Sequence, residues 1–121
     1  MDRSWRNPNL LRWHGKVYLI DHGASLIFHH NWPTAAASAG RATKLDDHVL
    51  MPFHPDVAGA DVALAPLVTS AAVDAATALV PDEWLDDEPG FESAAAVRVA
   101  YREWFAARIA SPRTWLPQVQ A

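Results

Sequence analysis

The stretch that decides the fold is the N-terminal run Met1-Asp-Arg-Ser-Trp-Arg-Asn-Pro-Asn-Leu-Leu-Arg-Trp-His-Gly-Lys-Val-Tyr-Leu-Ile-Asp-His-Gly23. Two segments of this run, 10–13 and 16–20, are rich in apolar and β-forming residues, and a His-Gly pair separates them. A glycine in so short a link favours a tight hairpin turn. The run therefore predicts a loop, then a two-stranded ribbon, then an aspartate, Asp21, where the ribbon ends.

Two helices are predicted further along the chain. The first is capped by Thr69 or Ser70 and runs to Val80, where a proline stops it. Its apolar positions recur at helical spacing and comprise Ala72, Val73, Ala75, Ala76, Leu79 and Val80. The second follows Ser93 and runs to about Ala110. Its apolar stripe comprises Val97, Tyr101, Trp104, Phe105 and Ile109.

The segments between these elements carry weaker signals. Residues 34–44 are rich in alanine, serine and threonine, so we expect a mobile loop that buries little surface. Residues 45–51 are expected to form a short helix, and residues 82–90 a solvated acidic connector. The predicted fold class is therefore mainly α with a short N-terminal β-hairpin, in which a helical body follows the hairpin.

The composition bounds the class of protein. A chain of 121 residues is one domain or part of one, and its apolar content of 50% is enough to build a core. A net charge of −4 argues against a general nucleic-acid or membrane-surface binder. The sequence has no cysteine and no run of about 20 apolar residues. We expect a soluble cytoplasmic protein.

The N-terminal run has the residue types that phosphoryl transfer from ATP requires. One carboxylate orients the acceptor hydroxyl, while an amide and a second carboxylate hold Mg²⁺ on the phosphates. In kinase-like enzymes the base and the amide lie five residues apart on one catalytic loop. Asp2 and Asn7 have this spacing, and Asp21 opens an Asp-x-Gly after the ribbon. The ribbon would return Asp21 to the loop, and Gly23 is expected to let the backbone turn away without a Cβ clash.

These residues resemble the HipA-like kinase family, in an actinobacterial form. The resemblance rests on residues 2–11, 13–15 and 19–24, and it extends through shorter matches into the final helix. Those matches are Phe28-His29-His30, Leu45-Asp46-Asp47-His48-Val49-Leu50 and Pro81-Asp82-Glu83-Trp84-Leu85. The resemblance covers most of this chain but only the C-terminal part of the family's fold. It implies the C-terminal, mainly helical lobe of a kinase-like enzyme.

The resemblance also implies a function, namely an ATP- and Mg²⁺-dependent serine/threonine-type kinase acting on a protein substrate. Asp2 matches the catalytic aspartate, Asn7 the metal ligand of the loop and Asp21 the second metal ligand. Asn9 is the alternative to Asn7, because the Leu-Leu that usually follows the ligand comes after Asn9. With Gly23 these residues form the predicted nucleotide and metal site.

The family organisation divides this chain into three parts. Residues 1–23 hold the catalytic loop, the hairpin and the Asp-x-Gly, residues 24–55 correspond to an activation segment, and residues 56–121 form the helical body. The family's N-terminal lobe has no counterpart, because the five glycines are scattered and no lysine precedes the loop. We therefore expect a truncated gene or an internal start site, and a chain that is inactive alone. The competing interpretation is a non-catalytic protein-interaction module or pseudokinase remnant, with its exposed apolar surface covered by a partner protein.

Other residue types have simpler interpretations. The adjacent histidines 29–30 point in different directions on a regular element, which argues against a shared zinc site. His22 is expected to pack beneath the metal site, and Trp84 and Trp104 in the core, whereas Trp5 would contact substrate or a missing lobe. Three hydroxyls in the 34–44 segment are incidental or, as the alternative, phosphate acceptors. They are Thr34, Ser38 and Thr43.

Overall fold

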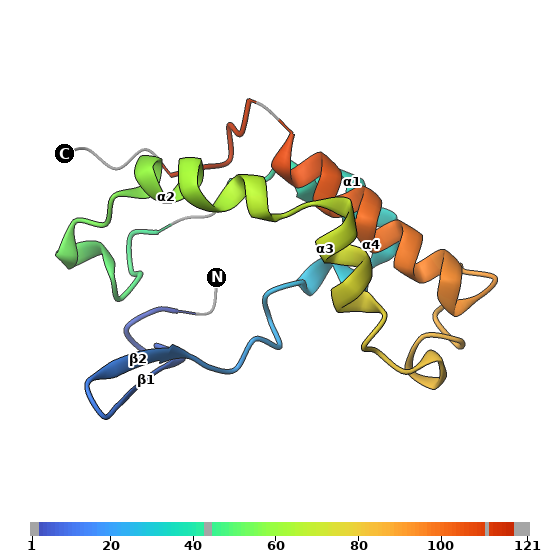
Figure 1. Ribbon diagram of the computed structural model, residues 1–121, viewed down its shortest axis with the longest axis horizontal. Helices are drawn as coiled ribbons and strands as arrows, with labels where there is room; N and C mark the ends of the chain where they lie inside the picture. The colour runs from blue at the N-terminus through green and yellow to red at the C-terminus, as the bar shows by residue number, and fades with distance from the viewer. Residues whose placement is uncertain (1–2, 43–44, 111, 118–121) are drawn as a thin grey trace.

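The computed structural model describes residues 3–42, 45–110 and 112–117. The strands are β1 (Leu10–Trp13) and β2 (Lys16–Leu19), and the α-helices are α1 (Ala35–Ala39), α2 (Val57–Leu64), α3 (Ser70–Thr77) and α4 (Ala94–Ile109). Short 3₁₀ helices are η1 (Ile27–His30), η2 (Trp32–Thr34), η3 (Met51–Phe53), η4 (Ala65–Leu67) and η5 (Asp82–Trp84). The hairpin lies at one end of the molecule, and α1, α3 and α4 pack together at the other (Figure 1). We call these the hairpin end and the helical end.

The hairpin is antiparallel, with Leu10 opposite Leu19 and Trp13 opposite Lys16. Its turn residues both have positive φ, 47° at His14 and 77° at Gly15. Two consecutive positive φ values are typical of the type I′ turn, which matches the natural twist of the strands. The predicted ribbon is therefore confirmed, with the second strand ending one residue before Ile20.

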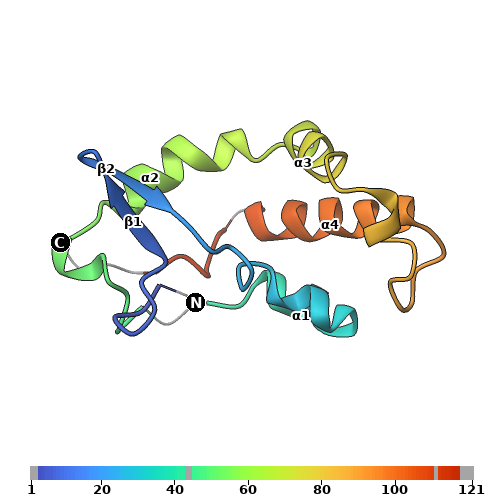
Figure 2. The ribbon, with the colours of Figure 1, turned by 90° about the horizontal axis from the view of Figure 1, so that it is seen from below.

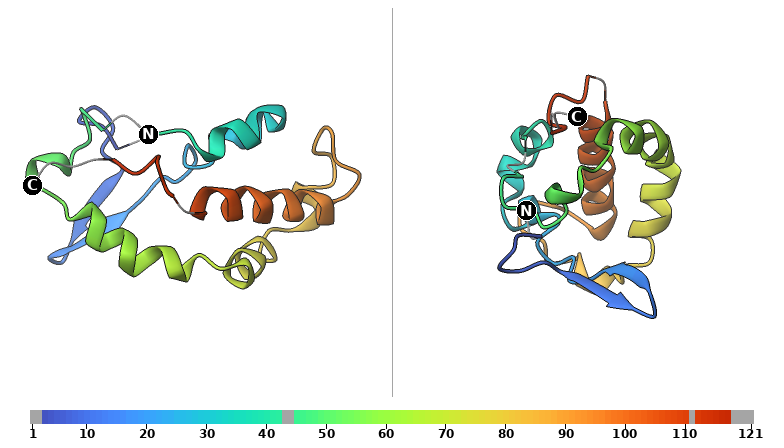
Figure 3. Two further views of the ribbon diagram at one scale, coloured as in Figure 1. Left: turned by 90° about the horizontal axis from the view of Figure 1, so that it is seen from above. Right: turned by 90° about the vertical axis from the view of Figure 1, so that its left-hand side faces the viewer.

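The helical end is built around α4, which lies between α1 and α3 (Figure 2, Figure 3). Ser93 caps α4, because its hydroxyl accepts a hydrogen bond from the N–H of Ala96 at 3.2 Å. Val97 is only 1% exposed, and the Phe28 ring stacks on Trp104 with centroids 4.2 Å apart. The core comprises Leu85, Ala94 and Val97 with Trp32, Val80, Phe91 and Tyr101 packed against them. The predicted helix and its apolar stripe are confirmed.

Helix α3 is shorter than predicted and buries less of its stripe. Thr69 caps it, accepting from the N–H of Ala72 at 3.1 Å, and the helix ends at Thr77. Arg98 of α4 donates to the carbonyl oxygens of Thr77 (3.2 Å) and Val80 (2.6 Å), which replaces the bonds of a further helical turn. Val73 is buried and Val80 half-buried, but the other predicted positions are exposed, Leu79 by 85%, so the predicted stripe is wrong at Ala72, Ala75, Ala76 and Leu79.

The expectation of a mobile loop at 34–44 is wrong for its described part, residues 34–42. This part contains α1, whose Ala35 and Ala39 are buried against α4. The indole N–H of Trp104 donates to the Ala35 carbonyl oxygen at 3.1 Å, and Arg108 donates to that of Ala39 at 2.8 Å. Alanines bury little area themselves, but they let α1 approach closely enough for the long side chains of α4 to cover it.

The short helix expected at 45–51 is not formed. This segment instead pairs with the N-terminal loop, because the N–H of Val49 donates to the Arg3 carbonyl oxygen at 3.0 Å and Ser4 forms a β-bridge with His48. Val49 is buried by this arrangement. Tertiary pairing has therefore overridden the local helical tendency.

Helix α2 was not predicted, because its apolar residues form no stripe. Asp56 caps it, accepting from the N–H of Gly59 at 2.8 Å. Asp61 holds it to the C-terminal segment through a two-pronged ion pair with Arg113, at 2.6 and 2.7 Å. Within the described residues no one helix has the length and apolar character to cross a bilayer, and one helix pair meets those criteria only jointly, across a 72° bend.

Candidate functional site

The N-terminal loop and the segment that leaves the hairpin lie side by side. The N–H of Ile20 donates to the carbonyl oxygen of Asn9 at 3.0 Å, and the side-chain amide of Asn9 donates to the carbonyl oxygen of Asp21 at 3.5 Å. The pairing of β1 with β2 produces this contact, because it carries the chain out and back to its starting point. The predicted return of Asp21 to the loop is confirmed.

Both residues of this contact have unusual backbone conformations. Asn9 has a φ of 45° and Asp21 a φ of 50°, in the left-handed region. Asn and Asp are the non-glycine residues that enter this region most readily, yet the conformation still costs free energy. Such strained positions concentrate at functional sites. Asn9 is also a buried polar residue, only 6% exposed, whereas Asp21 is exposed.

The structure separates the two asparagines that the sequence left open. Asn7 is exposed, and its backbone N–H donates to the Ser4 carbonyl oxygen at 3.1 Å in a tight turn. Asn9 is the asparagine whose side chain lies against the backbone of Asp21. Geometry therefore favours Asn9 as the amide of the site, although the five-residue spacing favours Asn7. Asp2, the predicted catalytic aspartate, lies outside the described residues.

Two expectations about the Asp-x-Gly are wrong. His22 is exposed rather than packed beneath the site, and its Nδ1 lies 3.3 Å from a guanidinium nitrogen of Arg3. A Cβ built on Gly23 would lie 3.7 Å from Oδ1 of Asp21, which is an ordinary contact, and Gly23 does not have a positive φ. Gly23 lies in a turn in which the N–H of Ser25 donates to the His22 carbonyl oxygen at 2.9 Å, and the positive φ of this segment is at Asp21, so the backbone does not require a glycine at position 23.

The donor set of this site is of the kind that Mg²⁺ prefers. Carboxylate and amide oxygens are hard ligands, and Mg²⁺ is commonly held by one or two protein groups together with phosphates and water. The exposed carboxylate of Asp21 and the amide of Asn9 provide two such groups on neighbouring segments. No cluster of three or more His, Asp or Glu suited to a metal occurs in the part of the chain that the structure describes. Asn9 and Asp21 therefore provide at most two side-chain ligands, and an ion held here would need its remaining ligands from water or from a bound molecule.

The N-terminal segment of the hairpin end is also basic, which the sequence analysis missed. Residues 3–23 carry four cations against the single carboxylate of Asp21, and these cations are Arg3, Arg6, Arg12 and Lys16. A cluster of one sign raises the local concentration of oppositely charged ligands. The signal was available in the sequence, because these four residues are a large share of its ten Lys and Arg. Asp46 and Asp47 lie on the segment that pairs with the N-terminal loop, so the excess of positive charge belongs to residues 3–23 and not to the whole hairpin end.

The remaining sequence predictions have mixed outcomes. Trp104 lies in the core as predicted, but Trp84 is 77% exposed, so its core assignment is wrong. Trp5 is exposed in the N-terminal loop. The Ser38 hydroxyl donates to the Ala35 carbonyl oxygen at 2.6 Å and accepts from Trp104, which gives it a structural role. Thr43 lies outside the described residues.

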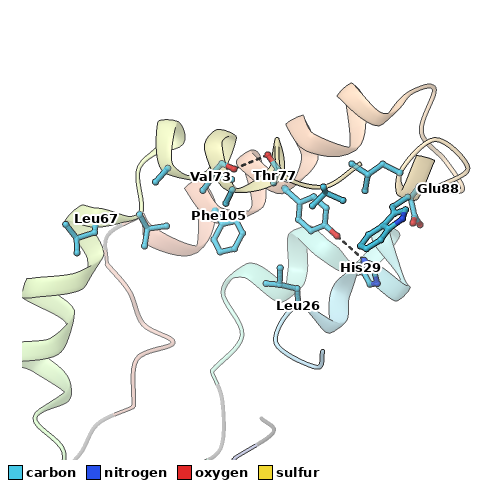
Figure 4. A pocket seen from close by; sticks show the side chains of 14 residues that line it. Leu26, His29, Leu67, Val73, Thr77, Glu88 and Phe105 are labelled. Atoms are coloured by element: carbon cyan, nitrogen blue, oxygen red, sulfur yellow. Dashed lines mark hydrogen bonds between the residues drawn. The ribbon is translucent and has the colours of Figure 1, made fainter. Parts of the chain in front are cut away.

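The helical end contains a groove of about 510 Å³, which the sequence did not reveal (Figure 4). We call it the helical-end groove, and its lining is mostly apolar side chains, including Leu67, Val68, Val73, Trp84 and Phe105. Its polar wall is formed by His29, whose Nδ1 lies 2.9 Å from the hydroxyl of Tyr101, and by Glu88. Burial raises the pKa of Tyr101, and the charge of Glu88 adds to this effect.

Comparison with known proteins adds no relative, since no protein-family model, curated protein or solved structure matches this chain.

Proposed function

We propose that the hairpin end is the metal-binding half of an ATP-dependent phosphotransferase of the HipA-like kinase type, acting on a protein hydroxyl. The observation that carries this proposal is the contact of Asn9 with Asp21 at the exit of the hairpin. It holds the side-chain amide of Asn9 against the backbone of Asp21, whose carboxylate is exposed, and both residues have left-handed backbone conformations. A kinase of this type would work in the cytoplasm, where Mg·ATP is abundant.

In this proposal each residue has a distinct role. Asp21 and Asn9, with Asn7 as the alternative to Asn9, would hold Mg²⁺, which neutralises charge on the phosphates. Arg3 and the neighbouring cations would attract the nucleotide. Asp2 would orient the acceptor hydroxyl, as the family resemblance implies. The proposed roles therefore need only metal binding, charge attraction and hydrogen bonding by these side chains.

The chain by itself is expected to be a weak binder and an inactive enzyme. Its five glycines are isolated from one another, and of its two lysines Lys16 lies at the hairpin turn. Phosphoryl transfer depends on positioning and charge stabilisation, so a site without a phosphate-covering loop loses most of its rate. We therefore expect measurable Mg·ATP binding but no turnover from these 121 residues.

The test is binding of a fluorescent ATP analogue with and without Mg²⁺. The wild-type chain should bind weakly and only with Mg²⁺, Asp21→Asn should weaken binding about tenfold, equivalent to about 1.4 kcal/mol, and Asp87→Asn should have no effect. Asp87 is the matched control because it is an exposed carboxylate at the helical end. Equal binding by wild type and Asp21→Asn would refute the proposed site. Phosphate transfer from labelled ATP by the wild-type chain alone would refute the expected inactivity.

A second candidate function is a non-catalytic protein-interaction module. Exposed apolar side chains on the hairpin favour it, notably Trp13, Val17 and Leu19. Patches of this kind mark protein-binding surfaces. In this alternative Asp21→Asn is silent in every assay, whereas Trp13→Ala abolishes binding of the protein partner.

A further inference from the structure

The helical-end groove is lined in part by an acidic segment, which contributes one carboxylate, Glu88, to its wall. Residues 82–92 carry six carboxylates and no cation, namely Asp82, Glu83, Asp86, Asp87, Glu88 and Glu92. Asp82 forms an ion pair with Arg98 at 2.6 Å, while Glu88 lines the groove beside Tyr101. Trp84 also lines it, with most of its indole in solvent. An exposed tryptophan at an apolar groove is the kind of side chain that dominates protein interfaces.

The hairpin has the complementary chemistry. Directly opposite residues of an antiparallel pair share a face, as do residues two apart on one strand. The register therefore places Leu11, Trp13 and Tyr18 on one face together with Lys16. The three apolar side chains of this face are exposed, Trp13 by 60%. The hairpin tip is thus an apolar surface with a cation, and it faces solvent.

The two complementary surfaces cannot meet within one chain. The hairpin lies at one end of the molecule and α3, which lines the groove, lies well away from it in two perpendicular views (Figure 1, Figure 2). A contact between them therefore requires two copies. Because the hairpin of one copy would meet the groove of another, the contact would be head-to-tail and would leave one hairpin and one groove open in each pair.

We propose that the hairpin tip of one copy docks in the helical-end groove of a second copy. Trp13 and Tyr18 fill the apolar groove, and Lys16 approaches Glu88, the carboxylate that lines it. The groove volume lies within the range of pockets that bind compact ligands, so it can receive a few large side chains. This contact needs neither nucleotide nor Asp21, so it stands or falls independently of the proposed function.

Sedimentation velocity of the full chain without nucleotide tests the proposal. The sedimentation coefficient should rise with protein concentration, and less so at about 0.5 M than at about 0.05 M salt, because salt screens the charges. Trp13→Ala and Trp84→Ala should each weaken self-association by about tenfold or more. Leu79→Ala is the matched control, since Leu79 is exposed at the helical end without lining the groove. It should associate as the wild type does.

Mixing the two tryptophan variants gives the sharpest readout. One variant keeps an intact groove and the other an intact hairpin, so an equimolar mixture should form pairs of two chains and stop there. K16E and E88K should each weaken association, and their mixture should restore it, which also covers the case in which a tryptophan variant misfolds. A monomeric wild type at every concentration, or mixtures no more associated than their components, would overturn the proposal and leave the groove to a partner of different sequence.

Discussion

The two ends of this molecule differ in how they are stabilised. The helical end has a core in which Val97 and Phe28 are buried and aromatic rings contact one another. In the hairpin end nearly every side chain is exposed, and Asn9 and Asp21 have strained backbone conformations. A two-stranded hairpin alone is marginally stable in water. The comparison teaches that the helical end provides the stability, whereas the hairpin end holds the candidate site.

The two ends also differ in charge. Residues 3–23 at the hairpin end carry four cations and one carboxylate, whereas residues 82–92 at the helical end carry six carboxylates and no cation. Asp46 and Asp47 beside the N-terminal loop, and the arginines of α4, partly offset this difference. The net charge of −4 conceals this separation. A basic end suits a nucleotide, and an acidic end beside an apolar groove suits a basic ribbon. The proposed metal site uses the basic segment alone, whereas the proposed contact between copies joins the basic hairpin of one copy to the groove of another.

The largest expected effect is at the core of the helical end. Phe28→Ala should lower the free energy of unfolding by about 3–5 kcal/mol, because it removes a buried ring stacked on Trp104. Trp84→Ala removes a larger but exposed ring, so it should change the free energy of unfolding by less than about 0.5 kcal/mol. Urea unfolding followed by circular dichroism measures both. Equal losses would show that stability does not reside in this core.

A smaller effect is expected at the start of α4. Ser93→Ala removes the hydroxyl that accepts from the N–H of Ala96, and it should lower stability by about 1 kcal/mol. Ser70→Ala is the control, because Thr69 rather than Ser70 caps α3. Chemical denaturation should show a shift for Ser93→Ala alone, and a shift of similar size for Ser70→Ala would argue against the capping role.

A local effect is expected in the hairpin. Gly15 has a φ of 77° and open space around its missing Cβ, so Gly15→Ala costs conformational strain of about 1 kcal/mol and no clash. Gly23→Ala should be nearly neutral, since its Cβ would make an ordinary contact. Hydrogen exchange should quicken in β1 and β2 of Gly15→Ala and stay unchanged in α4. Faster exchange in α4 as well would show that the two ends unfold together.

The smallest expected effect is a pH dependence at α2. The hydrogen bond from Arg113 holds the pKa of Asp61 below its ordinary value, so the pair contributes stability above the unfolded pKa and loses it as the pH falls through the lower, folded pKa. The protection factors of the α2 amides, which compare each observed exchange rate with the intrinsic rate at the same pH, should therefore fall on acidification below about pH 4. Asp61→Asn should exchange faster at neutral pH and show less change with acid. An unchanged acid response in Asp61→Asn would contradict this assignment.

Sequence reasoning succeeded where the cause of an element is local. The His-Gly pair predicts the hairpin turn, and Ser93 with the period of the following residues predicts α4. It failed for α1, because the bonds that hold the alanines of this helix come from Trp104 and Arg108, which are 69 residues from their partners Ala35 and Ala39. Pattern analysis also missed α2, whose apolar residues have no preferred face.

The candidate site shows the same division. The spacing predicts that Asp21 returns to the N-terminal loop, because a hairpin of fixed length determines that return. Sequence spacing selected Asn7, whereas the side chain beside Asp21 belongs to Asn9. Likewise, the residue with a positive φ is Asp21 and not Gly23. Backbone dihedral angles and buried amide contacts depend on three-dimensional packing, so spacing alone does not specify them.

The measurement that tests the central claim most directly is a titration of the isotopically labelled chain with Mn²⁺, a paramagnetic substitute for Mg²⁺, in the presence of ATP. The account predicts that the amide signals of Asn7, Asn9 and residues 20–23 broaden first, and that Asp21→Asn abolishes this broadening. It also predicts that signals of residues 82–92, whose carboxylates would bind the metal weakly, broaden only at higher metal concentration. Broadening that begins at residues 82–92, or that is the same in Asp21→Asn, would contradict the assignment of the hairpin end as the metal site.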